Sequence, residues 1–245
     1  MNRQDELQPF RQCYIAHRGL FDNESDHPEN TLAAFRRAVS AGYGIELDVQ
    51  LTADDVLVVI HDDDLKRVCG EDVLVKDLTY DELRRRHILA SEETVPLFSD
   101  VLEAIGGRVP LIVEVKTGPQ ITKRCRMTDE ALRHYRGVYC VESFDPRAVL
   151  WWRVRHPSVI RGQLGDVMTG GAGAWALTNM VFNLVTWPDF IAYNHRRSSG
   201  RVLAWWHRVL GCTMVAWTIK SQAELKAARR RGFRVFIFDS FIPDE

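Results

Sequence analysis

Short apolar runs alternate with amphipathic segments along most of this chain. The segments at 30–42 and 201–210, for example, place apolar residues three and four positions apart, which is the spacing of a helix. Short apolar runs separated by such segments are typical of parallel strands joined by helices. The runs that we predict as strands lie at 13–17, 45–49, 56–60, 111–115, 138–141, 159–162, 190–193, 213–217 and 235–238.

The run at 56–60 follows a polar turn at 52–55, so we expect it to return beside the strand at 45–49. Eight strands that alternate with helices then remain, and this number predicts a (β/α)8 TIM barrel. In such barrels the active site lies at the C-terminal ends of the strands. Only residues 239–245 follow the last strand, too few for an eighth helix. Either the N-terminal residues cover that part of the barrel, or its last layer is missing.

Residues 62–96 are polar and irregular, with one short helix expected at 80–86. They contain too few apolar residues for a core of their own, so we predict a small insertion after the second strand. The whole chain, residues 1–245, is then one barrel domain. A length of 245 residues with 46% hydrophobic residues suits a single large domain.

Composition excludes several classes of protein. A net charge of -1 argues against nucleic-acid binding, which usually needs a basic excess. Five dispersed cysteines resemble neither a disulfide framework nor a zinc site, and we expect reduced thiols in a cytoplasmic protein. No apolar segment reaches the roughly 20 residues of a transmembrane helix, although peripheral contact with a membrane is compatible with the sequence. The sequence does not define an oligomeric state.

Charged residues occur at the first apolar runs. Glu46 and Asp48 are two positions apart, so on a strand their side chains share one face. Buried carboxylates on one face repel each other unless a cation or protons offset them, and a divalent metal does this well; ion pairs with arginines are the alternative. His17, Arg18 and His61 complete the groups needed to cleave a phosphate ester. An arginine binds phosphate oxygens, a metal neutralises charge, and two imidazoles accept and donate a proton.

The chain resembles the glycerophosphodiester phosphodiesterase family. Five motifs occur in the order and spacing of that family, and the resemblance rests on this order because no single motif is specific. It implies a metal-dependent enzyme that hydrolyses glycerophosphodiesters to glycerol 3-phosphate and an alcohol. The motifs are His17-Arg18-Gly19, Pro28-Glu29-Asn30-Thr31, Glu46-Leu47-Asp48-Val49 with Thr52 and Asp54, His61-Asp62, and Glu114-Val115-Lys116.

The resemblance also implies roles for individual residues. His17 and His61 match the catalytic acid and base, without a decision on which is which. Glu46, Asp48 and Glu114 match the ligands of one divalent cation. Ligation by oxygen atoms alone favours Mg²⁺ or Ca²⁺ over zinc. The attacking oxygen belongs either to water or to the neighbouring glycerol hydroxyl of the substrate.

Five further residues are candidates for the site. Arg18 and Lys116 flank the predicted ligands and are expected to bind the phosphate, although arginines and lysines are usually surface charges. Phe144 and Trp217 follow two strands and either line the pocket for the alcohol group, as the resemblance implies, or belong to the barrel core. Glu29 either holds the metal or Arg18, or orients the loop after the first strand through hydrogen bonds.

Residues 170–187 begin with glycines and continue as an apolar segment that contains Trp175 and Trp187. This segment is too apolar for a loop and too short to span a bilayer. It forms either a helix buried on both sides or a lipid-facing flap hinged by the glycines. The flap suggests an alternative function, a lysophospholipase D that acts on lysolipids. A non-catalytic module that binds phosphodiesters or membranes is a further alternative, but a sensor needs no acid and base.

Overall fold

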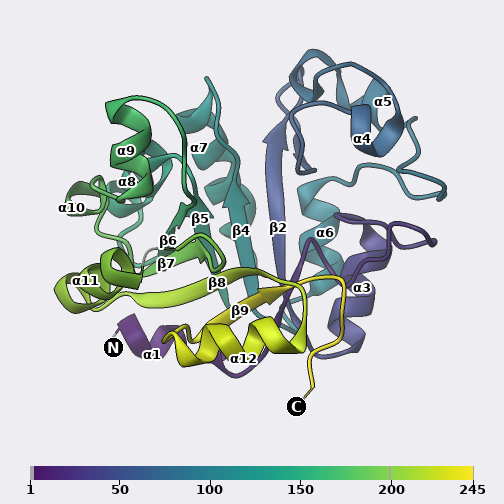
Figure 1. Ribbon diagram of the computed structural model, residues 1–245. Helices are drawn as coiled ribbons and strands as arrows, with labels where there is room; N and C mark the ends of the chain where they lie inside the picture. The colour runs from purple at the N-terminus through teal and green to yellow at the C-terminus, as the bar shows by residue number, and fades with distance from the viewer. Residues whose placement is uncertain (1–2, 199, 245) are drawn as a thin grey trace. The chain divides into compact units, whose positions relative to one another are not determined.

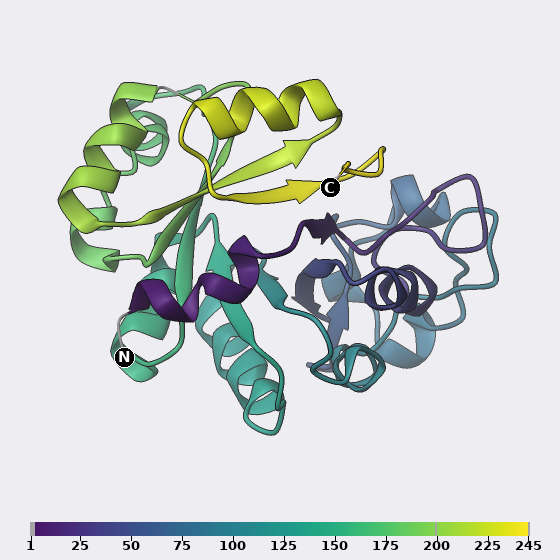
Figure 2. The same ribbon diagram turned by 90° about the horizontal axis from the view of Figure 1, so that it is seen from below.

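The computed structural model describes residues 3–198 and 200–244 (Figures 1 and 2). The chain divides into two compact units. Unit 1 comprises Met1–Ile15 and Cys140–Glu245, and unit 2 comprises Ala16–Tyr139. No helix in the described part of the chain has the length and hydrophobicity needed to cross a membrane.

Unit 2 is organised around strand β2 (Gly44–Leu51), which is buried along its whole length. It pairs with β1 (Ile15–His17) and, in parallel, with β4 (Leu111–Val115). Helix α3 (Leu32–Ser40) begins where the Thr31 side chain accepts a hydrogen bond from the Ala34 N–H, as a helix cap does. The longer helices α6 (Phe98–Ile105) and α7 (Ile121–Leu132) follow later in this unit.

The predicted insertion lies within unit 2, after the returning strand. Strand β3 (Leu57–Val59) runs antiparallel to β2, and α4 (Lys66–Cys69), η1 (Val75–Asp77) and α5 (Tyr80–Leu83) follow, with α4 and α5 beyond the upper end of β2 in Figure 1. The insertion does have a small hydrophobic core, but it shares this core with the strand. The buried cluster consists of Val58, Ile60, Leu65, Val68, Val75, Leu78, Leu83, Ile88 and Val95.

The described residues of unit 1 form five strands, each hydrogen-bonded to the next in chain order. From β5 onward each neighbouring pair is parallel. The strands are β5 (Tyr139–Ser143), β6 (Arg161–Gly165), β7 (Phe190–Asn194), β8 (Thr213–Ile219) and β9 (Val235–Phe238). The helices between them are α8 (Pro146–Arg155), α9 (Ala172–Thr178), α10 (Asn183–Thr186), α11 (Gly200–Leu210) and α12 (Gln222–Arg230).

Residues 3–15 belong to unit 1. They form two short helices, α1 (Arg3–Glu6) and α2 (Gln8–Arg11), seen at the N-terminus in Figure 2. Leu7 and Phe10 are each only 1% exposed. The Arg3 guanidinium forms an ion pair with Asp189, next to the start of β7.

The segment at 170–187 differs from one of its two predicted forms. It contains two short helices, α9 and α10, instead of one, and several of its large apolar side chains are exposed to solvent. Trp175 is 63% exposed and Val185 is 55% exposed. The prediction of a helix buried on both sides is therefore wrong.

Candidate active site and metal centre

Three carboxylates converge inside unit 2. The parallel register of β2 and β4 pairs Asp48 with Glu114, and Glu46 lies two residues before Asp48 on the same face. All three residues are buried: Glu46 is 3% exposed, Asp48 is 1% exposed and Glu114 is 6% exposed. One oxygen of each lies within 4.8 Å of the others. The structure thus brings together the three residues that we predicted as metal ligands.

Positive groups surround Asp48. The Lys116 Nζ atom lies 3.3 Å from Asp48 Oδ1 and 3.0 Å from Glu114 Oε1, and Asn30 donates a hydrogen bond of 2.9 Å to Asp48 Oδ2. The Arg18 Nε atom is 3.7 Å from the same Asp48 oxygen. Burial alone would raise the pKa of Asp48, but Lys116, His61 and Arg18 lower it below the usual range.

Glu114 behaves in the opposite way. Burial, together with the nearby Asp48 charge, raises the pKa of Glu114 to about 7, although Lys116 acts against this shift. A carboxyl group with this pKa is only partly ionised at neutral pH, and a divalent cation bound beside it would favour the ionised form. Three buried carboxylates whose oxygens converge are a suitable donor set for a hard divalent cation such as Mg²⁺ or Ca²⁺.

Both predicted catalytic histidines border this cluster. His17 ends β1, and its Nε2 atom lies 4.0 Å from Glu46 Oε2. His61 follows β3, and its Nδ1 atom lies 2.6 Å from Asp62 Oδ1. Burial lowers the pKa of His61, and Lys116 and Arg18 add to this effect against the opposite influence of Asp48 and Asp62. An imidazole that donates from Nδ1 to a carboxylate keeps its lone pair on Nε2.

The turn after β1 has a conformation that its sequence explains. Arg18 has a φ angle of 57° and Gly19 one of 86°, both in the left-handed region. A Cβ atom on Gly19 would lie 2.9 Å from the Cβ atom of Ala34, so only glycine fits against α3. The turn directs the Arg18 N–H to Glu46 Oε2 at 3.2 Å, while the Arg18 carbonyl accepts a bond of 2.9 Å from the Asn30 N–H.

A network of ion pairs connects the histidine to the arginine of the site. Asp62 Oδ2 accepts a bond of 2.6 Å from Arg67 Nε, and the two terminal nitrogens of Arg67 bind Glu29 at 2.6 and 2.7 Å. Glu29 in turn accepts from Arg18 Nη1 at 2.7 Å. Burial would raise the pKa of Glu29, but Arg67 and Arg18 lower it to about 2. Glu29 thus contacts both Arg18 and, through Asn23, the loop after β1, so its role in the site stays a prediction.

Sequence reasoning missed Arg67. Its position in the insertion, five residues after the His61-Asp62 motif, gives no signal of a role in the site. Asp62 belongs to the His61-Asp62 motif, so its contact with the imidazole could have been anticipated. His61, Asp62, Arg67 and Lys116 line an open cavity of about 620 Å³, together with Asp63, Asp64, Lys66 and Thr117.

Phe144 and Trp217, predicted to bind the alcohol group, both lie in unit 1. Their rings meet edge to face, with centroids 5.6 Å apart and planes at 89°. Both side chains are half-buried. This geometry suits either an aromatic pocket wall or ordinary core packing, so their role in the site stays a prediction.

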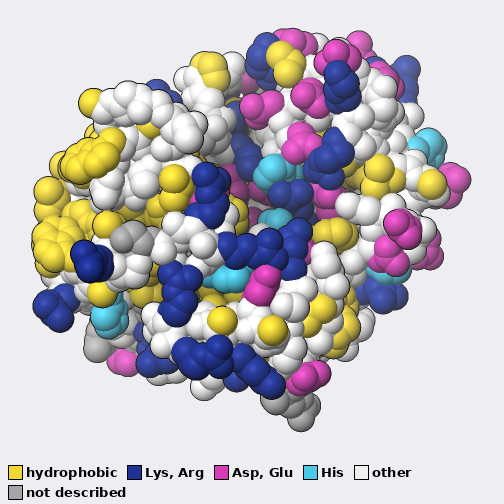
Figure 3. All heavy atoms as spheres, in the orientation of Figure 1, with side chains coloured by type: hydrophobic (Ala, Val, Ile, Leu, Met, Phe, Trp, Pro, Cys, Tyr) yellow, Lys and Arg dark blue, Asp and Glu magenta, His cyan; other side chains and the backbone are white. Residues whose placement is uncertain are grey.

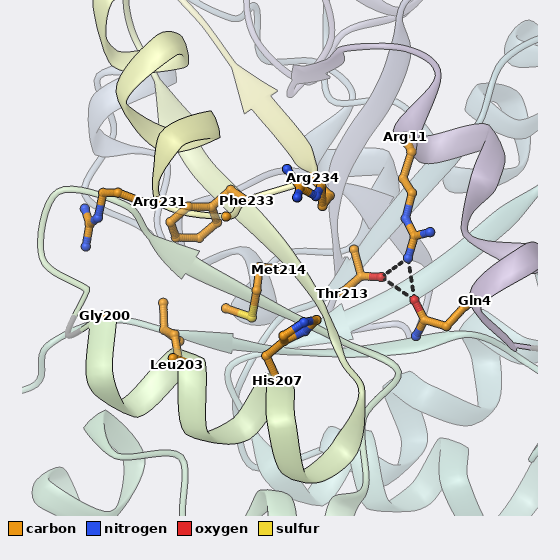
Figure 4. A pocket seen from close by; sticks show the side chains of 12 residues that line it. Gln4, Arg11, Gly200, Leu203, His207, Thr213, Met214, Arg231, Phe233 and Arg234 are labelled. Carbon is orange, nitrogen blue, oxygen red and sulfur yellow. Dashed lines mark hydrogen bonds between the residues drawn. The ribbon is translucent and has the colours of Figure 1, made fainter.

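Unit 1 also contains a cavity of about 370 Å³ (Figure 4). Its wall combines basic side chains, among them Arg11 and Arg234, with the apolar side chains of Leu203, Met214 and Phe233. Arg11 is held in place by hydrogen bonds to Gln4 and Thr213, drawn as dashed lines in Figure 4. The described residues that line this cavity include no carboxylate, so it is not the predicted metal centre.

Comparison with solved structures confirms the fold class. The chain superimposes on a phosphodiesterase from Oleispira antarctica, solved in complex with the product sn-glycerol-3-phosphate, with a TM-score of 0.77 over 93% of each chain at 21% identity. The fold is therefore the predicted (β/α)8 TIM barrel. Residues 17–242 match the model of the glycerophosphoryl diester phosphodiesterase family, and the chain belongs to that family.

Two curated relatives with higher identity match shorter stretches. A glycerophosphodiester phosphodiesterase of Bacillus altitudinis is 44% identical over 109 residues, which are 42% of this chain and 43% of that protein. The human protein named lysophospholipase D GDPD1 is 33% identical over 131 residues, which are 48% of this chain and 40% of that protein. The matched region thus spans less than half the length of each of these two relatives.

Proposed function

We propose that this protein is a metal-dependent phosphodiesterase that hydrolyses glycerophosphodiesters to glycerol 3-phosphate and an alcohol. The observation that carries this proposal is the buried convergence of Glu46, Asp48 and Glu114 beside His17 and His61. Family membership supports it independently. The cytoplasmic location remains a prediction.

The carboxylates would bind the metal ion, and the basic residues would bind the phosphate group. Glu46, Asp48 and Glu114 would hold one Mg²⁺ or Ca²⁺ ion, which when bound supplies positive charge that polarises the phosphoryl group. Arg18 and Lys116 would bind the non-bridging phosphate oxygens, since a guanidinium and an ammonium are common phosphate ligands. Both already lie beside the carboxylates, within 3.7 Å of Asp48.

In this proposal the two histidines transfer the protons. One takes the proton of the attacking hydroxyl, which belongs to water or to the glycerol group, and the other protonates the departing alkoxide. Each transfer typically contributes about 10²–10⁴-fold to the rate. Asp62 fixes the His61 ring through Nδ1, so in this proposal Nε2 is the atom that accepts or donates the proton. Phe144 and Trp217 would line the pocket for the alcohol group.

The decisive variant is Glu46→Gln, which keeps the shape of the side chain and removes its charge. We expect it to abolish metal-dependent turnover of glycerophosphocholine, and a chelator should do the same to the unchanged protein. Glu103→Gln, at an exposed position on α6, is the matched control and should leave turnover unchanged. Unchanged turnover in the Glu46 variant would refute the ligand assignment.

A lysophospholipase D activity is the second candidate. The name of the human relative and the exposed apolar side chains at 175–187 favour it. Turnover should therefore be measured in parallel on glycerophosphocholine and lysophosphatidylcholine. Turnover of the lysolipid alone would support the second candidate. A variant with polar residues in place of Phe182 and Leu184 should then lose this activity. Turnover of neither, with metal bound, would favour a non-catalytic binding module.

A further inference from the structure

Exposed large apolar side chains are concentrated in one part of unit 1. Elsewhere in the described ranges, 3–198 and 200–244, only Val138, Val154 and Ile242 are exposed to this degree. In Figure 3 hydrophobic side chains gather along the left edge, where Figure 1 places α10 and the adjoining parts of α9 and α11. We call this region the apolar surface; it consists of Trp175, Val181, Phe182, Leu184, Val185, Trp187, Trp205 and Val209.

Buried contacts connect the elements that carry this surface. Trp206 of α11 is 2% exposed, and its indole N–H donates to the Asn179 carbonyl between α9 and α10 at 3.0 Å. The Arg153 guanidinium of α8 lies 5.8 Å from the centroid of the Trp187 ring and donates to the Val185 carbonyl. The exposed tryptophans therefore belong to one packed assembly of helices, and their exposure is a property of the folded protein.

Basic residues accompany the apolar ones. Arg201, Trp205, Arg208 and Val209 occupy positions i, i+4, i+7 and i+8 of α11, so they share one face, and all four are exposed. Between residues 167 and 223 the sequence has a single acidic residue, Asp189. That residue is 8% exposed and pairs with arginines. The surroundings of the apolar surface are therefore positively charged.

We propose that the apolar surface docks on a lipid bilayer that contains anionic lipids. Tryptophan rings favour the boundary between headgroups and acyl chains, and arginines beside them are attracted by negative headgroups. A contiguous exposed apolar patch of this kind marks an interaction site, whereas scattered apolar residues do not. A second copy of the chain fits less well. A symmetric interface would bring the Arg201 and Arg208 side chains of two copies together without acidic partners from this region.

The test is cosedimentation of the full-length protein with vesicles. We expect binding to vesicles of phosphatidylcholine and phosphatidylglycerol, weaker binding to phosphatidylcholine alone, and a loss of binding as the salt concentration rises. Tryptophan emission should shift to shorter wavelengths when the vesicles bind, because indole rings leave water. Failure to bind vesicles of either composition would refute the proposal.

Two double variants locate the contact. Trp205→Ser with Val209→Ser removes apolar contact, and Arg201→Gln with Arg208→Gln removes charge. Each double variant should weaken vesicle binding at least tenfold. For the arginine pair this follows from a contribution of about fivefold by each arginine near an anionic surface. Circular dichroism and glycerophosphocholine turnover should stay unchanged, because these side chains are exposed. Ile242→Ser, at a position 62% exposed outside the apolar surface, is the matched control and should bind normally.

The remaining outcomes also decide the question. Unchanged vesicle binding in both double variants would refute the assignment of the surface. If the serine variant instead turns an oligomer into a monomer in sedimentation velocity, with vesicle binding unchanged, the surface joins copies of the chain and the proposal is wrong. Glu46→Gln should keep full vesicle binding, so failure of the catalytic proposal and failure of this one can be distinguished.

Discussion

Glu29 is the residue whose replacement tests the ion-pair network most directly. It is 4% exposed, and its carboxylate accepts bonds from Arg18, Arg67 and Asn23. Glu29→Gln keeps the size of the side chain but removes the charge that both guanidinium groups contact. We therefore expect a large loss of stability, since removing one member of a buried ion pair leaves the other partly unneutralised.

The size of this loss follows from the pKa of Glu29. Burial would raise that pKa, but Arg67 and Arg18 lower it from 4.5 to about 2. A shift of this size corresponds to about 3 kcal/mol of folding free energy at neutral pH. Because the pKa is lowered in the folded state, this stabilisation is complete above pH 4.5 and disappears as the pH falls through about 2. At pH 3 about 1.5 kcal/mol should remain.

Urea unfolding of the wild type and of the Glu29→Gln variant, at pH 7 and at pH 3, measures both values. Other groups titrate in this range, but they do so in both proteins and cancel in the difference. Asp81→Asn is the matched control, because Asp81 pairs with Arg84 at 2.8 Å while the two side chains are 73% and 55% exposed. An exposed pair contributes little, so this control should lose less than about 0.5 kcal/mol.

Two results would contradict this reasoning. One is a Glu29→Gln variant that is no less stable than the Asp81→Asn control at pH 7. The other is a stability difference from the wild type that is equally large at pH 7 and pH 3. The second result would mean that the loss comes from packing or hydrogen bonding and not from the charge of Glu29.

Three further changes have distinct expected effects. Thr31→Ala removes the cap of α3 and should lower the free energy of unfolding by about 1 kcal/mol, whereas Thr31→Ser should restore most of it in the same urea titration. Asp62→Asn should reduce kcat by about 10²-fold and shift the pH profile of kcat, because the His61 ring loses its carboxylate partner; an unchanged pH profile would argue for a purely structural role. Lys116→Met removes the cation between Asp48 and Glu114, so it should raise the KM for the diester and tighten divalent-metal binding in calorimetry, and weaker metal binding would contradict this account.

The strands could be predicted because burial leaves a clear mark on the sequence. A strand covered on both faces needs apolar residues throughout, and the run at 111–115 is β4 without a change of bounds. The strand predicted at 159–162 instead begins at Arg161, a buried charged residue 3.6 Å from Asp189. An apolar pattern does not anticipate a strand residue whose charge is balanced by a residue 28 positions away.

The candidate site was predictable where its residues share a strand or a motif. Glu46 and Asp48 needed only the period of a strand, and Glu114 needed the resemblance to the family. Arg67 had neither, since its contact with Glu29 depends on how the insertion folds back. The segment at 170–187 shows a related limit. The hydrophobicity of this segment indicates that its burial is favourable. It does not indicate whether the segment is buried in the protein interior or against another partner.

The insertion supports residues of the proposed active site. Arg67 lies on α4 next to Val68, which is 3% exposed and belongs to the hydrophobic cluster shared with β3. Packing of Val68 in that cluster fixes the backbone from which Arg67 reaches Asp62 and Glu29. Because Asp62 contacts His61 and Glu29 contacts Arg18, displacement of α4 would disturb two groups together, the one proposed to transfer a proton and the one proposed to bind the phosphate. Loss of packing in the insertion should then lower kcat and raise KM at once, while the carboxylates on β2 and β4 keep their register.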